Sequence, residues 1–149
     1  MSLFYTISED IKKAMLAKEK EKLEALRAVK AAFLLARTNA GVGGELLPEE
    51  ELKIVQKLVK QRKESAEIYQ QQNRQDLADK ELLEASVIEQ YLPAQMSEQE
   101  LETVLKSIIE RVGAKTPADM GKVMGVATKE LSGKADGKSI SIKVKQLLN

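Results

Sequence analysis

Apolar residues recur every three or four positions along most of this chain. The clearest stretch carries Leu101, Val104, Leu105, Ile108 and Val112, a spacing that places all five side chains on one face of an α-helix. Segments containing glycine or proline separate this stretch from others of the same kind. The pattern therefore predicts an all-α fold. Only 3% of residues are aromatic and none is Trp, so the helices have to pack through aliphatic side chains.

Local signals set the expected ends of the helices. Capping-box spacings predict helix starts at Thr6 with Glu9 and at Ser97 with Glu100, because the first side chain can accept a bond from the backbone three residues later. Proline in a first turn, an Asp cap and glycine stops give the other boundaries. The expected helices are residues 6–18, 20–39 (ending at the glycine-rich loop 40–44), 48–72, 76–92, 97–113, 116–133 and 136–149.

The last segment admits a second interpretation. Residues 139–145 alternate polar and apolar side chains, which is also the pattern of a strand. A single strand without a partner would leave its backbone groups unpaired, so we favour a helix.

Pro93 divides the pattern into two parts, because the residue before a proline avoids the α-helical region. We expect an N-terminal helical bundle or hairpin over residues 1–92, a hinge at 93–96, and a small three-helix tail domain over 97–149.

The chain contains no His and no Cys. This composition excludes imidazole bases, thiolate nucleophiles, disulfides and zinc sites with nitrogen or sulfur ligands. We expect no catalytic residue, metal or cofactor. No apolar run approaches the roughly 20 residues that span a bilayer, and the first ten residues do not resemble a signal peptide, so a cytoplasmic location without membrane contact is expected.

Positive charge is concentrated near the C-terminus. The whole chain has a net charge of only +1, whereas residues 113–149 hold seven Lys against three acidic residues, a net charge of +4. A basic segment of this kind is typical of a surface that follows nucleic-acid phosphates, although the near-neutral total argues against a general DNA-binding protein.

Three segments together resemble the GatB/YqeY family. They are Lys60-Gln61-Arg62-Lys63-Glu64-Ser65, Tyr91-Leu92-Pro93-Ala94-Gln95-Met96-Ser97, and Asp119-Met120-Gly121-Lys122-Val123-Met124 followed by Gly133-Lys134-Ala135-Asp136. Their order and spacing resemble those of the stand-alone YqeY proteins over nearly the whole chain.

The resemblance implies a function related to tRNA. The C-terminal part is similar to the tail domain of the B subunit of aminoacyl-tRNA amidotransferases, which contacts the outer corner of tRNA. Stand-alone members are grouped with carbon–nitrogen ligases that use glutamine as amide donor. The catalytic body of that subunit has no counterpart here, and Ile142 stands where the family usually has polar residues. The implied partners are tRNA and components of an amidotransferase or an aminoacyl-tRNA synthetase.

Two basic clusters are candidate RNA-binding sites. The main one surrounds a turn and a helix start, whose free backbone N–H groups suit a phosphate; Gly121 and Gly125 serve either close approach of a partner or packing between helices. The second lies on two N-terminal helices, and we favour its explanation as a solvated face with Lys–Glu pairs along one helix, for which Glu64 and Glu67 are in reach. The main cluster comprises Lys122, Lys134 and Lys138 with Lys115, Lys143 and Lys145; the second comprises Arg27, Lys30, Lys60, Arg62 and Lys63.

Two other motifs are assigned no function. Residues 133–139, Gly-Lys-Ala-Asp-Gly-Lys-Ser, have one residue too few for a phosphate-binding P-loop and follow a helical pattern rather than a strand. Glu49, Glu50 and Glu51 complement the positive end of their own helix dipole.

The first hypothesis is therefore a tRNA-binding or auxiliary protein without a catalytic centre of its own. A helical adaptor between proteins, without RNA binding, is the alternative. The ligase activity of the family label would require a partner that supplies the ATP and glutamine chemistry.

Overall fold

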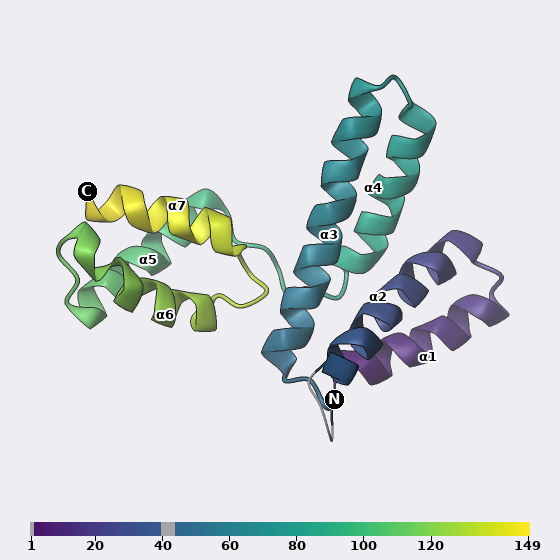
Figure 1. Cartoon of the computed structure of the whole chain (residues 1–149), viewed down its shortest axis with the longest axis horizontal. Helices are drawn as coiled ribbons and strands as arrows, with labels where there is room; N and C mark the ends of the chain where they lie inside the picture. Colours follow the sequence, from purple (N-terminus) through teal and green to yellow (C-terminus); the bar gives the residue numbers. More distant parts are fainter. Residues whose placement is uncertain (1, 40–43) are drawn as a thin grey trace. The chain divides into compact units, whose positions relative to one another are not determined.

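A computed structural model describes residues 2–39 and 44–149. In these residues all regular structure is helical, which confirms the all-α prediction. The chain forms two compact units, residues 1–92 and 93–149. Figure 1 shows α1 to α4 in the first unit and α5 to α7 in the second. The helices are α1 Leu3–Leu16, α2 Lys20–Asn39, α3 Pro48–Gln71, α4 Gln75–Glu89, α5 Glu98–Val112, α6 Met120–Glu130 and α7 Gly137–Leu148, with a 3-10 turn at Pro117–Asp119.

The N-terminal unit has one mainly aliphatic core to which all four helices contribute. Phe33 is the largest fully buried side chain, and Ile7, Leu26, Val55 and Ile88 are also fully buried. The helical spacing predicted for residues 20–39 is confirmed, since Leu26, Val29 and Phe33 all face this core. The predicted loop at residues 40–44 lies, apart from Gly44, outside the described residues.

The predicted start of the first helix is wrong. Helix α1 begins at Leu3 and not near Thr6. Thr6 lies inside the helix, and its hydroxyl donates to the carbonyl oxygen of Ser2 at 3.4 Å. A threonine in a helix can bond to the carbonyl four residues earlier, so the Thr–Glu spacing had a second structural explanation.

Glu51 provides the cap that α1 would otherwise lack. Its carboxylate accepts the N–H groups of Leu3 at 3.3 Å and Phe4 at 3.0 Å, although it belongs to α3. The side chain of Glu51 is only 2% exposed and is the one buried charged group among the described residues. The sequence interpretation of Glu51 as a partner of its own helix dipole is incomplete: Glu51 lies in the first turn of α3 and also stabilises the start of another helix. Glu50 does act locally, because it accepts the N–H of Leu47 at 2.8 Å.

Helices α3 and α4 form an antiparallel hairpin. The turn between them spans residues 72–74, and Asn73 adopts a left-handed conformation with φ of 57°. Helix α4 ends at Glu89, three residues before the predicted end at Leu92. The hydroxyl of Tyr91, in the turn that follows, donates to Asp10 on α1 at 2.5 Å. The pKa of Tyr91 is raised mainly by burial and further by the hydrogen bond to Asp10, so the phenol stays protonated over the physiological range.

The C-terminal unit packs α5, α6 and α7 around a second aliphatic core. Leu105, Ile108, Val123, Ile140 and Val144 are almost fully buried there. The helix predicted for residues 139–145 is confirmed, and the alternative strand is wrong. Ile142, which stands where the family usually has polar residues, is 50% exposed.

Both predicted caps in the C-terminal unit are confirmed. The hydroxyl of Ser97 accepts the N–H of Glu100 at 3.1 Å, and the carboxylate of Asp136 accepts the N–H of Ser139 at 2.9 Å. Gly113 ends α5 in the left-handed conformation, with φ of 71°, where a side chain would be strained.

The segment predicted as a hinge is partly held by the C-terminal unit. The N–H of Met96 donates to the carbonyl oxygen of Lys134 at 3.0 Å. The side-chain amide of Gln95 donates to the carbonyl oxygen of Gly133 at 2.7 Å. Met96 also packs against the second core. Movement between the two units stays a prediction, and these bonds confine it to Pro93 and Ala94.

Replacing Glu51 with Ala should lower the free energy of unfolding by about 2 kcal/mol, because two helix N–H groups lose their acceptor. Glu49→Ala is the matched control, since Glu49 is exposed, lies on the same first turn and has no such bond. Urea unfolding followed by circular dichroism measures both. Equal losses for the two variants would show that Glu51 acts only through the dipole of α3.

Limited proteolysis should cut the chain at Ala94, which is exposed and precedes the bonds made by Gln95 and Met96. The released fragment, residues 95–149, contains the whole second core and should retain helical circular dichroism. A fragment that unfolds on release would show that the two units share their stability.

Candidate RNA-binding surface

The lysines predicted to bind RNA lie on two helices and two turns of the C-terminal unit. Helix α6 carries Lys122, helix α7 carries the last three, and the turns on either side of α6 carry the rest. Lys143 is half-buried, and the other predicted lysines are exposed. The full set, including Lys129 on α6, is Lys115, Lys122, Lys129, Lys134, Lys138, Lys143 and Lys145.

None of these seven lysines forms an ion pair with a described residue. The three acidic residues of the same segment, in contrast, all have partners. Glu130 forms a two-bond pair with Arg111 of α5, at 2.7 and 2.9 Å. Asp136 caps α7, and Asp119 accepts the N–H groups of Lys115 at 2.9 Å and Thr116 at 3.3 Å. The positive charge of this segment is therefore available to a ligand.

Two glycines leave the outer face of α6 without side chains. Gly121 and Gly125 are both exposed, and a Cβ added to either would meet no atom within 4 Å. Packing between helices of this unit, one explanation considered for them, is therefore wrong. Successive helical residues are 100° apart, so Gly121, Gly125, Lys122 and Lys129 share one side of α6. That side is smooth and positively charged.

The start of α7 is less suited to a phosphate than the sequence indicated. Asp136 already accepts the N–H of Ser139 through its carboxylate, and its carbonyl oxygen accepts the N–H of Ile140 at 3.1 Å. The carboxylate also repels an anion at the same place. The N–H of Ser139 is therefore not free for a phosphate. Phosphate binding at this turn, with the side chains of Lys134 and Lys138, stays a prediction. The rejection of a P-loop is confirmed, because helix α6 and not a strand precedes this turn.

The second basic cluster is divided by interhelical pairs. Arg62 of α3 pairs with Glu84 of α4 at 3.2 Å, and Lys63 pairs with Glu89 at 3.2 Å. The predicted pairs of this cluster with Glu64 and Glu67 along α3 are wrong, because the antiparallel hairpin brings α4 carboxylates closer.

The other members of the second cluster lie apart from these pairs. Lys30 lies 5.8 Å from the ring centre of Phe4, whereas Arg27 and Lys60 are exposed and unpaired among the described residues. Only Arg62 and Lys63 of this cluster form ion pairs with described residues, and RNA binding by the cluster stays a prediction.

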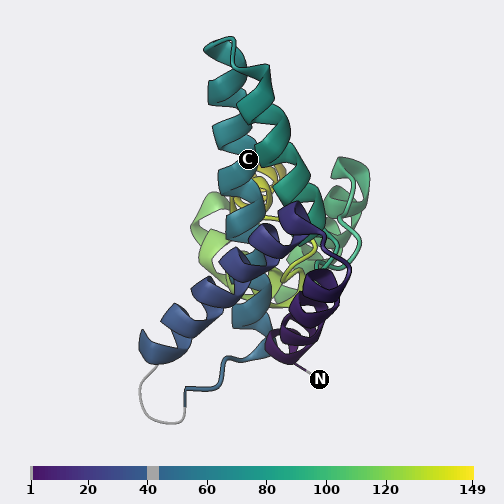
Figure 2. The same ribbon diagram turned by 90° about the vertical axis from the view of Figure 1, so that its right-hand side faces the viewer.

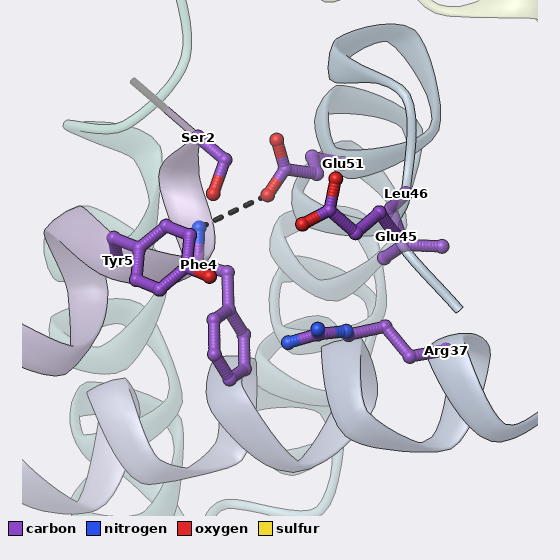
Figure 3. A pocket seen from close by; sticks show the side chains of 7 residues that line it. All are labelled: Ser2, Phe4, Tyr5, Arg37, Glu45, Leu46 and Glu51. Atoms are coloured by element: carbon purple, nitrogen blue, oxygen red, sulfur yellow. Dashed lines mark hydrogen bonds between the residues drawn. The ribbon is translucent and has the colours of Figure 1, made fainter. Parts of the chain in front are cut away.

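A cavity of about 260 Å³ lies beside the start of α1 (Figure 3). The guanidinium of Arg37 stacks on Phe4 at 4.5 Å, and its Nε donates to the carbonyl oxygen of Gly44 at 2.9 Å. Glu51, on the opposite wall, is bonded to the α1 backbone. Both charged groups thus have structural roles. The lining residues are Ser2, Phe4, Tyr5, Arg37, Glu45, Leu46 and Glu51.

No metal or membrane site is evident in the part of the chain that the structure describes. No three acidic side chains converge as they would around an ion. None of the helices there has the length and hydropathy needed to cross a bilayer.

The fold and this surface define a class: an all-α protein whose three-helix C-terminal unit bears unpaired lysines. A family model described as Yqey-like protein matches residues 4–148, and the chain belongs to this family. The family resemblance inferred from the three sequence motifs is confirmed.

Curated relatives carry the name altered inheritance of mitochondria protein 41, mitochondrial. Those from Clavispora lusitaniae, Pyrenophora tritici-repentis and Meyerozyma guilliermondii are 33%, 27% and 39% identical to this chain. The alignments cover 76%, 95% and 58% of this chain and 66%, 78% and 44% of the respective relatives. The chain thus spans slightly less than two thirds of the Clavispora protein.

Lowering the pH should loosen the turn at Lys115–Met120. The backbone bonds from Lys115 and Thr116 hold the pKa of Asp119 below its ordinary value, and Lys122 adds to the effect. A lowered folded-state pKa gives stability that is present above the unfolded value and is lost as the pH falls through the folded one. Asp119→Asn should abolish this acid-dependent part. Amide exchange of Lys115 and Thr116, compared in wild type and variant between about pH 5 and pH 3, tests it; identical pH profiles would contradict the assignment.

Proposed function

We propose that this protein binds tRNA through its C-terminal unit and serves as an auxiliary protein without a catalytic centre of its own. The observation that carries the proposal is the imbalance of pairing in residues 113–149. All three acidic side chains there have hydrogen-bond or ion-pair partners, whereas none of the seven lysines forms an ion pair with a residue that the structure describes. Free lysines on a folded surface attract the phosphate backbone and release its counterions.

The glycines of α6 support contact with a backbone. Glycine within a helix costs about 0.5–1 kcal/mol relative to alanine, and nothing in the C-terminal unit fills the space beside Gly121 or Gly125. A partner that approaches α6 closely accounts for both residues, and Lys122 and Lys129 would then reach phosphates on either side.

The chemistry of the surface favours folded RNA over single strands. Residues 93–149 contain no aromatic side chain, so bases cannot stack as they do on single-strand binders. Recognition through shape and phosphate position suits a structured RNA. Similarity to the amidotransferase tail domain, which contacts the outer corner of tRNA, is the reason for naming tRNA.

The ligase activity with which the family is grouped would need a partner protein that supplies the ATP and glutamine chemistry. Components of an amidotransferase or an aminoacyl-tRNA synthetase are the partners proposed from the resemblance. The cytoplasmic location is likewise a proposal from the sequence; the printed names of the relatives describe those proteins as mitochondrial.

Replacing Lys122, Lys134 and Lys138 together with Ala should weaken tRNA binding and reduce the dependence of log K on log salt by about 2 to 3, since each lost phosphate contact removes about 0.7–0.9. The choice of tRNA should not change. Arg27→Ala with Lys60→Ala is the comparison variant from the second cluster, because these residues are exposed and have no ion pair with a described residue; per charge removed it should reduce the slope less. Filter binding at several salt concentrations measures both. A triple variant with unchanged slope would exclude this surface.

Gly125→Ala should raise stability and weaken tRNA binding at the same time. Alanine favours the helix by about 0.5–1 kcal/mol, and its methyl group would enter the space open to a partner. Ser107→Ala, on an exposed position of α5, controls for helix stabilisation alone and should leave binding intact. Thermal unfolding and filter binding test the pair. If Gly125→Ala stabilised the protein without affecting binding, the α6 face would not be the contact.

A further inference from the structure

The outer part of the α3–α4 hairpin, residues 64–84, forms a distinct surface of the N-terminal unit. We call it the acidic arm. In both views its loop end extends beyond α1 and α2 (Figures 1 and 2). Ala66 and Ala78 are buried within the arm, and neither belongs to the main core. The arm is therefore held together by close contact of its two helices, and its outer side chains are available to a partner.

The charge of the acidic arm is opposite to that of the C-terminal unit. Residues 64–84 hold six acidic and two basic residues, a net charge of −4. The two basic residues are already engaged: Arg74 pairs with Asp76 at 3.0 Å and Lys80 with Glu24 of α2 at 3.7 Å.

Four carboxylates of the arm, Glu64, Glu67, Asp79 and Glu81, have no ion pair with any described residue. Of these, Asp79 accepts a hydrogen bond from the side-chain amide of Gln75 at 2.7 Å. The negative charge of the four carboxylates is not neutralised by the fold and can act on a ligand.

A groove of about 490 Å³ runs between the two helices of the arm. Glu64 and Glu81 line it from α3 and α4, and the Arg62–Glu84 pair also belongs to its wall. Ile68 lies in the same groove and is 52% exposed. The groove therefore combines free carboxylates with one exposed apolar side chain; its full lining is Gln61, Arg62, Glu64, Ser65, Ile68, Glu81 and Glu84.

We propose that this groove docks a basic, amphipathic segment of a partner protein. Lysine or arginine side chains of the segment would pair with Glu64 and Glu81, and an apolar side chain would cover Ile68. Charge complementarity selects this occupant. An RNA phosphate would be repelled, and an acidic or neutral helix would leave the carboxylates without partners.

This inference goes beyond tRNA binding and does not depend on it. With both surfaces active, the protein links a basic protein to RNA through two separate parts of one chain. If the protein is an adaptor between proteins, the α3–α4 hairpin is the surface that binds one of its partners.

The test uses the full-length protein and a fluorescently labelled amphipathic peptide of about 14 residues, or about four helical turns, with leucine and lysine at helical spacing. Anisotropy at about 0.15 M salt should show saturable binding. Glu64→Gln with Glu81→Gln should weaken it about tenfold, as expected for two partly exposed ion pairs. Ile68→Ala should weaken it about fivefold. Circular dichroism verifies that each variant keeps its helices.

Glu67→Gln is the matched control, because Glu67 is a free carboxylate on the same helix but does not line the groove. It should change the affinity less than twofold. Glu67→Gln removes one charge and the double variant removes two, so an effect of Glu67→Gln on the binding free energy at least half that of the double variant would show that only overall charge acts, and would overturn the proposal. So would equal affinity for a control peptide in which glutamine replaces leucine, or no binding of the original peptide.

Two further measurements distinguish the other occupants. The double groove variant should bind tRNA as the wild type does; a loss of tRNA binding would assign the groove to RNA and overturn the proposal. Sedimentation velocity should give the same molecular mass for both proteins. Self-association that disappears in the double variant would make a second copy of this chain the occupant, which would also overturn it.

Discussion

A buried carboxylate holds the N-terminal unit together. Removing the charge of Glu51 from water is costly, and the cost is offset because two backbone N–H groups of α1 bond to it at the positive end of that helix. The bonds join segments 47 and 48 positions apart in sequence. They fix the start of α1 against α3, and through Phe4 they place the ring on which Arg37 stacks. The same first turn also carries one wall of the cavity shown in Figure 3.

The two units differ in how their basic side chains are paired. In the N-terminal unit, Arg62, Lys63 and Lys80 pair across helices, so these positive charges stabilise the fold. In residues 113–149 of the C-terminal unit, the three acidic residues accept backbone N–H groups or pair with Arg111, and the seven lysines have no ion pair with a described residue. The net charge of +1 for the whole chain does not reveal that positive charge collects in residues 113–149 and negative charge in residues 64–84. A near-neutral protein thus carries a basic segment in one unit and an acidic arm in the other.

Much of the helical fold could be predicted because its signals are local. Apolar spacing identified the face of residues 20–39, and Ser97, Gly113 and Asp136 act on backbone groups within a few residues of themselves. Thr6 shows the limit of such signals. Its spacing with Glu9 fits a capping box, but the cap of α1 comes from a residue far away in the chain, so α1 begins earlier than local chemistry indicates.

The sequence by itself determined the helical class, the family, most helix boundaries and the basic character of the last 37 residues, 113–149. These properties depend on neighbours in the chain or on composition. Only the tertiary structure decided which charges are free. It paired Arg62 and Lys63 with α4, buried Glu51 against α1, exposed Gly121 and Gly125, and left Glu64 and Glu81 facing a groove. Pairing and exposure depend on which helices pack together, and helix packing brings together residues that no local pattern connects.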